Sequence, residues 1–313
     1  MDALHLGKWN GQNLMANNIN SKLDRLRARR SGSDRLEKIS EDARQFIATK
    51  RVSKESWESR ASGKPFTRYA IGSMQAVDPD YTRISVETGR RVENQLRTRL
   101  TKTGLSVDFR LQGSVPLDVH IRGVSDVDLL VLDTSFLVYE TTGVKANSGA
   151  YFSSPKNTLG VLLNLRNEIE RELPLAFYAA DVDTTGSKAV KISGGSLARP
   201  VDVVPSHWWD TVEYQASNQE YDRGVRILDK DNYVTLGNLP FLHIKRVGDR
   251  CNLVAGGLRK AIRLCKNLKA DAADEGRQID LSSFDLVSTL YHADQDGLRL
   301  GYIYELAILA ETQ

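Results

Sequence analysis

The chain has 313 residues, of which 41% are hydrophobic and 27% are charged. A chain of this length and balance can bury one large core or two smaller ones, and it is too apolar to be disordered. We therefore expect a protein with two lobes. The 43 lysines and arginines are nearly balanced by 40 acidic residues, so the net charge of +3 makes no general case for nucleic-acid binding.

Neither a signal peptide nor a membrane span is predicted. The N-terminal sequence MDALHLGKWNGQ has no apolar stretch followed by a small-residue cleavage site, and no uninterrupted apolar run reaches roughly 18 residues. We expect a cytoplasmic protein that does not contact a membrane. Cys251 and Cys265 are too few for a disulfide framework, and we expect both to be small buried or half-buried side chains.

The first hundred residues are expected to be helical after a loosely ordered start over residues 1–16. Apolar positions recur at helical spacing between residues 17 and 49, with an interruption near Ser31-Gly32-Ser33. Their basic residues are interpreted as a solvated helical face. A long amphipathic helix is predicted over residues 82–103, and Gly104 ends it.

The middle of the chain has the composition of a mixed α/β lobe. Strands are predicted at residues 107–111, 126–132, 175–182, 189–192 and 200–204, with a helix at 157–172 and a short helix beginning near Pro116. After Trp209 the pattern is helical, at 239–247, 253–268, 281–292 and 301–311. The predicted class is α+β, with a catalytic lobe over residues 1–208, a helical lobe over 209–313, and a site in the cleft between them.

The stretch SDVDLLVL places two carboxylates in a strand that is otherwise apolar. Because alternate strand side chains share a face, Asp126 and Asp128 point to the same side of the sheet. Two carboxylates held together in apolar surroundings repel each other and lose hydration, unless a cation lies between them. Hard oxygen ligands of this kind favour Mg²⁺ or Mn²⁺, which completes its coordination with waters and substrate phosphates.

A phosphate-binding turn and a third carboxylate accompany this pair. Gly113-Ser114 lies just upstream, where glycine permits close backbone approach and the serine hydroxyl can donate to a phosphate oxygen. Asp202 lies in a later strand-like stretch, PVDVVP. Each signal is weak by itself, but their combination in this order indicates a site that binds a divalent metal ion and a phosphate.

These motifs resemble the signature of the polymerase-β-like nucleotidyltransferase superfamily, which is a Gly-Ser turn, an Asp-x-Asp pair and a third Asp. The segment IRGVSDVDL is more narrowly similar to the oligoadenylate synthetase and cGAS branch, and within it to the bacterial cGAS/DncV-like nucleotidyltransferases, or CD-NTases. The resemblance is strong over residues 112–133 and good over 199–205. It is weaker over residues 258–290.

The resemblance also implies residues in the helical lobe. LRKAIRLCKNLK is similar to the family helix whose lysine holds the triphosphate, which implies Lys266. SSFDLVSTL is similar to the next helix, which implies phosphate contact by Ser283 and places the aromatic Phe284 beside it. The chain departs from the animal enzymes at Val119, where they carry a threonine, so no phosphate or metal contact is expected there.

The resemblance implies synthesis of a cyclic di- or trinucleotide second messenger from NTPs, with release of pyrophosphate, in bacterial anti-phage (CBASS) defence. Asp126, Asp128 and Asp202 would hold two Mg²⁺ or Mn²⁺ ions for an in-line displacement, while Gly113, Ser114, Lys266 and Ser283 bind the nucleotide. The expected partners are NTP substrates and regulatory or effector proteins of a defence operon. A monomer is expected, and no nucleic-acid activator is indicated.

Two other functions compete with this interpretation. An enzyme that extends RNA, by CCA addition or polyadenylation, has the same catalytic signature but needs a long basic track, which a net charge of +3 does not favour. A non-catalytic sensor could bind nucleotide or double-stranded RNA on the basic N-terminal helices. It would have no need of three carboxylates.

Overall fold

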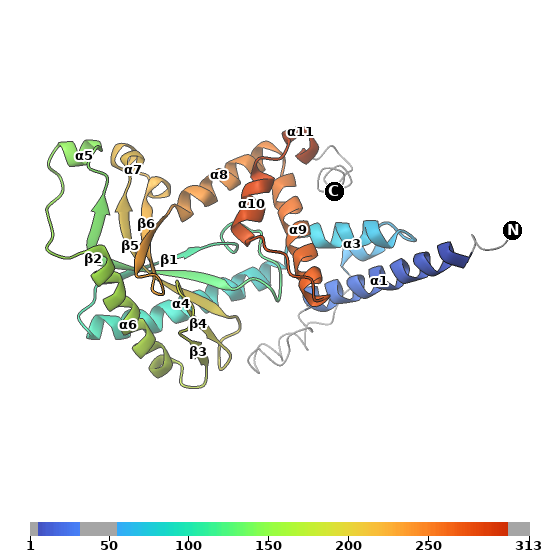
Figure 1. The fold of residues 1–313 in the computed structure, drawn as a ribbon, viewed down its shortest axis with the longest axis horizontal. Coiled ribbons are helices and arrows are strands. Elements are labelled where there is room, and N and C mark those ends of the chain that lie inside the picture. The colour runs from blue at the N-terminus through green and yellow to red at the C-terminus, as the bar shows by residue number, and fades with distance from the viewer. Residues whose placement is uncertain (1–5, 32–54, 300–313) are drawn as a thin grey trace.

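The computed structural model describes residues 6–31 and 55–299, drawn in colour in Figure 1. The helices predicted after Gly32 and over residues 301–311 lie outside these described ranges. None of the helices within them combines the length and the apolar run that crossing a bilayer requires.

The described elements alternate between helices and strands. The helices are α1 (Leu6–Ser31), α3 (Pro65–Met74), α4 (Pro79–Lys102), α5 (Val144–Asn147), α6 (Thr158–Ala176), α7 (Val212–Ser217), α8 (Pro240–Leu253), α9 (Gly257–Asp274), α10 (Ser283–Tyr291) and α11 (Gln295–Leu298), with single 3-10 turns η2 (Ser56–Ser59) and η3 (Glu220–Asp222). The strands are β1 (Val107–Gln112), β2 (Val127–Tyr139), β3 (Asp181–Asp183), β4 (Val190–Ser193), β5 (Val201–Asp210), β6 (Gly224–Asp229) and β7 (Val234–Asn238).

All seven strands form one mixed sheet in the order β1-β2-β5-β4-β3, with β6 added to β5 and β7 to β6. The central pair, β2 and β5, is parallel, and the remaining pairs are antiparallel. Side chains on one face of the sheet pack against α4 and α6, as Leu129 and Val203 do. The opposite face carries Leu130 and Val204, and with them, by alternation, the carboxylates of Asp128 and Asp202.

Local sequence accounts for the long helix α4. Asp78 caps its start by accepting a hydrogen bond from the Asp80 amide at 2.8 Å, and Pro79 occupies the first turn, where a missing N–H costs nothing. Val92, Leu96 and Leu100 recur every four residues and are fully buried, each contributing about 1.5–3 kcal/mol. Gly104 ends the helix with a left-handed φ of 85°, as predicted.

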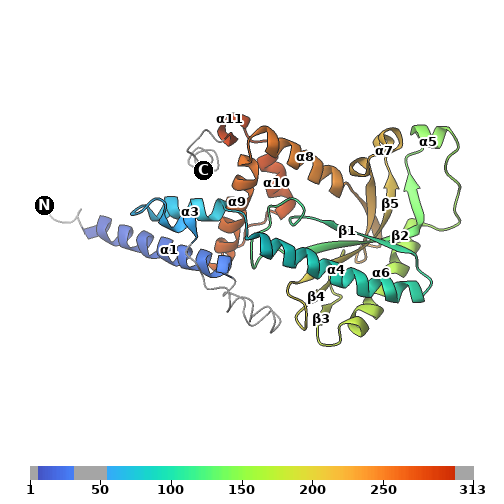
Figure 2. The same ribbon diagram turned by 180° about the vertical axis from the view of Figure 1, so that it is seen from behind.

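A second core gathers helices from both ends of the chain. Ile19 and Leu23 of α1 join Ile71 of α3 and Leu258 and Ile262 of α9 in one buried cluster. Figures 1 and 2 show these helices, with α10 and α11, toward the end of the molecule opposite α5. This second core is the interior of the helical lobe. Helices α1 and α3 pack into it, although the predicted boundary assigned residues 1–208 to the catalytic lobe.

The basic residues of α1 tie the helices together instead of forming a solvated face. Arg29 is 4% exposed and donates to Asn267 and Asp271 of α9, both at 2.8 Å. Arg25 pairs with Glu275 at 2.6 Å, and Arg30 pairs with Glu55. These three arginines therefore do not form the exposed cationic surface that the RNA-sensor hypothesis needs.

Several predicted elements differ in the structure. Two strands, β6 and β7, follow Trp209, so the boundary predicted between residues 208 and 209 cuts through β5 and the sheet continues beyond it. The segment predicted as a strand at residues 175–182 is mostly the end of α6 and a turn, with only β3 as a strand. Helix α1 begins at Leu6, earlier than the loosely ordered start allowed.

No helix begins near Pro116. Residues 113–124 form successive turns, in which Val115, Leu117 and Val119 are buried alternately and Asp118 has a left-handed φ of 55°. The alternation is incompatible with the 3.6-residue period of a helix. Burial of every second side chain between the two cores therefore determines the path of this segment, which we call the β1–β2 loop.

Candidate active site

The strand register brings Asp128 and Asp202 side by side. In the parallel β2–β5 pair, Asp128 lies directly opposite Asp202, and directly opposed residues point to the same face. On the other side of β2, the antiparallel β1–β2 pair sets Gln112 opposite Asp128, and Gly113 follows at once. The predicted Gly-Ser turn and two of the predicted carboxylates thus meet at one end of the two central strands.

Gly113 is required by its closeness to Asp128. A Cβ placed on Gly113 would lie 2.0 Å from the Oδ2 atom of Asp128, and the residue has a left-handed φ of 75°. Both facts exclude a larger residue without local movement. The backbone of the turn therefore lies directly against the Asp128 carboxylate, one of the three predicted metal ligands.

The two carboxylates destabilise each other in their charged forms. Burial, together with the neighbouring charges of Asp202 and Asp126, raises the pKa of Asp128 to about 7, against the opposing effect of Lys266. Burial also raises the pKa of Asp202. Buried acids with raised pKa values are typical of functional sites, and a cation between them would relieve their repulsion.

Lys266 supplies one of the positive charges facing this group. Its side chain is 7% exposed, and its Nζ donates to the Ser125 Oγ at 3.2 Å, next to Asp126. Burial lowers the pKa of Lys266 to about 8, while the charge of Asp128 works in the opposite direction. The structure thus brings the predicted triphosphate lysine to the predicted carboxylates from the other lobe.

Helix α9 also holds the β1–β2 loop in place. Arg263 donates to the backbone carbonyl and the carboxylate of Asp118, at 2.6 and 2.7 Å, and Arg259 donates to the Leu117 carbonyl at 2.9 Å. Val119 is 1% exposed and belongs to the helical core. Its side chain is consequently used for packing in the helical lobe.

Asp126 differs from the other two carboxylates in its partner. It immediately precedes β2, and its Oδ2 accepts a hydrogen bond from the Nζ of Lys191 on β4. Within the described residues, no three acidic, histidine or cysteine side chains form a ready-made metal group. The donor set nevertheless fits a hard cation, because mutual repulsion and burial already disfavour the charged forms of Asp128 and Asp202.

The structure shows where the other residues predicted to contact the nucleotide lie, but their contacts within the protein do not test that role. Ser114 is half-buried in the turn, and its carbonyl accepts from the Val119 amide at 3.1 Å. Ser283 is exposed at the first residue of α10, which Ser282 caps. Phe284 is exposed and its ring lies 4.9 Å from that of His243. The roles of Ser114 and Ser283 in phosphate binding remain predictions.

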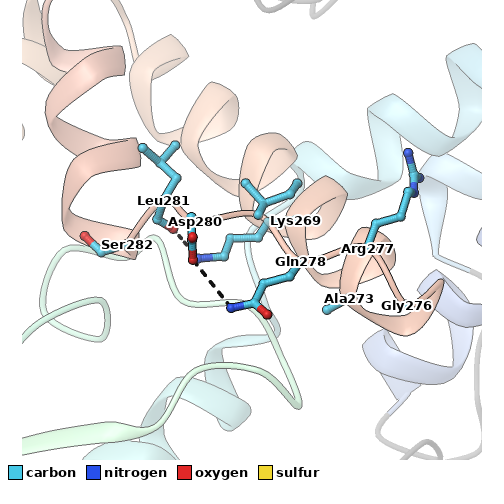
Figure 3. A pocket seen from close by; sticks show the side chains of 9 residues that line it. Lys269, Ala273, Gly276, Arg277, Gln278, Asp280, Leu281 and Ser282 are labelled. Atoms are coloured by element: carbon cyan, nitrogen blue, oxygen red, sulfur yellow. Dashed lines mark hydrogen bonds between the residues drawn. The ribbon is translucent and has the colours of Figure 1, made fainter.

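A hollow of about 750 Å³ lies beside the end of α9 and the segment that leads to α10. Figure 3 shows Lys269, Arg277 and Asp280 around it, with Lys269 donating to the Leu281 carbonyl. Neither the predicted catalytic carboxylates nor Lys266 line this hollow. The hollow is therefore separate from the group of charges formed by the three carboxylates and the two lysines.

Both histidines near the site in sequence are interior packing residues. His120 contacts the Thr82 hydroxyl at 3.0 Å and stacks on Tyr81, and burial lowers its pKa to about 4. His207 is buried, and its Nδ1 donates to the Trp208 carbonyl at 2.9 Å. Both cysteines are placed as expected, Cys251 buried and Cys265 half-buried.

Sequence reasoning missed Lys191 and Ser125. Lys191 lies opposite Asp202 in the antiparallel β4–β5 pair. A signal existed, since two strand-like stretches separated by a Gly-Gly turn indicate a hairpin. The pairing that places Lys191 beside Asp202 is known only from the register.

Comparison with known proteins identifies relatives along most of the chain. No family model matches it. The cyclic dinucleotide synthase CdnE of Yersinia aleksiciae is 51% identical over 258 residues, which are 82% of this chain and 66% of that protein. A c-di-GMP synthase of Lachnospiraceae bacterium (strain RUG226) is 31% identical over 72% of this chain and 68% of its own length. The chain thus spans about two thirds of the length of these relatives.

A solved structure agrees with this similarity. The STING-associated CdnE c-di-GMP synthase from Capnocytophaga granulosa superposes with a TM-score of 0.64 at 28% identity, over 91% of this chain and 79% of that one. The shared fold, the identity to the curated relatives and the meeting of the turn with the carboxylates lead to one assignment. The chain belongs to the bacterial cGAS/DncV-like nucleotidyltransferases.

Proposed function

We propose that this protein joins two nucleoside triphosphates into a cyclic dinucleotide and releases pyrophosphate at each bond. The observation that carries the proposal is the pair Asp128 and Asp202 on adjacent parallel strands, with the backbone of Gly113 against them and Lys266 opposite. The names of the relatives, a cyclic dinucleotide synthase and c-di-GMP synthases, support this product class.

Each residue of the site has its own role in the proposed reaction. The Gly113-Ser114 turn offers backbone and hydroxyl donors to the phosphates, and the Lys266 ammonium neutralises the charge that collects on the leaving pyrophosphate. Asp202 accepts the proton of the acceptor ribose hydroxyl, whose oxygen forms a new bond to the α-phosphorus as the bond to the β-phosphate breaks. A second round with the linear intermediate, in which its other end is the acceptor, closes the ring.

Asp126, Asp128 and Asp202 would hold two Mg²⁺ or Mn²⁺ ions. Such ions supply charge neutralisation on the attacking and leaving oxygens when they are bound. The raised pKa values of Asp128 and Asp202 support this role, because a site that repels its own charges gains most from a cation.

A role in anti-phage defence is proposed on the same basis. The structural relative from Capnocytophaga granulosa is described as STING-associated, and this chain would by analogy send its product to an effector protein of a defence operon. We propose NTP substrates and no nucleic-acid activator. The charged side chains of α1 support the latter, because they are paired with acids within the protein.

The proposal is tested by incubating purified protein with all four NTPs and Mg²⁺ or Mn²⁺, then treating the products with phosphatase. Mass spectrometry should find a phosphatase-resistant cyclic dinucleotide and should find none with Asp128→Asn. A parallel reaction with labelled RNA addresses the competing activity. Elongated RNA without a cyclic product would refute the proposal in favour of an RNA-extending enzyme.

A further inference from the structure

Lys191 lies in a row of charged residues that crosses three strands. It is opposite Asp202 in the β4–β5 pair, and Asp202 is opposite Asp128 in the β2–β5 pair. Its ammonium extends to Asp126, which it contacts directly. The positive charge of Lys191 lowers the pKa of both Asp128 and Asp202 against the larger effect of burial. One lysine therefore acts electrostatically on all three carboxylates.

The two lysines of the site differ in their exposure. Lys266 is 7% exposed and is hydrogen-bonded to Ser125. The side chain of Lys191 is 44% exposed and extends from a short strand near the sheet edge. Because a lysine ammonium is strongly hydrated and has a flexible stem, the more exposed Lys191 is the charge that a cation entering the carboxylate group would displace toward solvent.

We propose that Lys191 is a built-in counter-ion, which neutralises Asp126 in the metal-free enzyme and is displaced when a divalent ion binds there. This inference rests on the proposed function, because it assumes that the carboxylates hold the ion. It assigns to Lys191 a positioning role: the lysine keeps the empty site folded and raises the ion concentration that the enzyme requires. The displaced ammonium stays close enough to donate a hydrogen bond to a nucleotide phosphate.

Removing the lysine charge should strengthen ion binding. A unit charge at contact distance from a carboxylate in a half-exposed site changes the affinity of a competing cation by on the order of tenfold. We expect Lys191→Met to lower the Kd for Mn²⁺ by about that factor, and to lower the Tm of the protein in EDTA because Asp126 is left without its cation. Lys191→Arg keeps the charge and should stay near the wild-type Kd.

The experiment measures Mn²⁺ binding to the whole chain without nucleotide, by electron paramagnetic resonance of the free ion. Lys188→Met is the matched control, because it removes an exposed lysine three positions earlier in the chain, whose charge acts on Asp229. Thermal melts with EDTA and with Mn²⁺ run alongside and establish that each variant is folded. An Asp126→Asn background tests the ion pair itself, since the loss of Tm in EDTA on Lys191→Met should disappear there.

The outcomes separate this inference from the proposed function. A tenfold tighter Mn²⁺ Kd in Lys191→Met, together with a loss of Tm in EDTA that is absent from the Asp126→Asn background, supports the counter-ion role. An unchanged or weaker Kd in folded Lys191→Met, with a wild-type enzyme that binds Mn²⁺ and forms product, overturns the inference and leaves the function intact. A wild-type protein that neither binds Mn²⁺ nor forms product overturns the function itself, and the inference with it.

Discussion

Replacing Gly113 by alanine should remove activity while leaving most of the stability. The added Cβ would lie 2.0 Å from Asp128 Oδ2, whereas such atoms essentially never approach within 3.0 Å. Either the turn or the carboxylate must therefore move by about 1 Å, and a displacement of that size can cost about a hundredfold in rate. We expect kcat/KM for dinucleotide formation to fall by about that factor.

The cost in stability comes mainly from the backbone. An alanine at a φ of 75° in the left-handed region costs about 1–2 kcal/mol. Gly104→Ala is a matched control, because Gly104 has a φ of 85° and a Cβ added there would meet no atom within 4 Å. It should lose similar stability and keep its activity.

The assay compares steady-state rates of product formation, by chromatography, with the free energy of unfolding in urea for both variants. Full activity in Gly113→Ala would refute the reasoning, since it would mean that the closeness of the turn to Asp128 does not matter for catalysis. Equal losses of activity in the two variants would also refute it, because strain and not the clash would then be responsible.

Three further predictions concern charge. Burial raises the pKa of Asp128 to about 7 in the folded, metal-free protein, so unfolding releases its proton between about pH 4 and 7. The free energy of unfolding should therefore fall as the pH rises across that window, and it should fall less steeply in Asp128→Asn. Urea titrations in EDTA measure both slopes. Lys266→Met should raise the KM for NTPs and lower kcat/KM by about a hundredfold. In the wild type, the contribution of this ammonium should decline as the pH passes about 8, because the lysine then loses its proton. Initial rates from pH 6 to 9 check both expectations, and an unchanged KM would contradict the assignment. Arg29→Ala should cost about 3 kcal/mol, since it removes the close partner of the fully buried Asp271 carboxylate; a change in Tm within error would contradict this.

The catalytic signature is local in the chain, which is why it could be predicted. Asp126 and Asp128 share a face through the two-residue period of a strand, and the preceding Gly-Ser turn is read from composition. The helices α4, α6, α8, α9 and α10 were predicted because their apolar positions repeat at helical spacing, although α8 and α9 each continue six residues beyond their predicted ends.

Tertiary structure decided the partners of these residues. The register sets Asp202 opposite Asp128 and Lys191 opposite Asp202, and no local pattern specifies a pairing between strands 74 positions apart. The same holds for the β1–β2 loop, which follows alternate burial between two cores instead of the helix that Pro116 favoured. Packing against the rest of the protein overrides local preference there.

The sequence by itself indicated the family, since a Gly-Ser turn, an Asp-x-Asp pair and a third Asp in this order resemble the nucleotidyltransferase signature. Only the folded chain decided how their charges are balanced. Long-range pairing brings Lys191 to Asp126 and Lys266 to Ser125, and it turns Arg29 of α1 inward to Asp271 of α9. The strength of a charge interaction depends on the distance between the two charges, and packing of the two cores against the β1–β2 loop sets that distance.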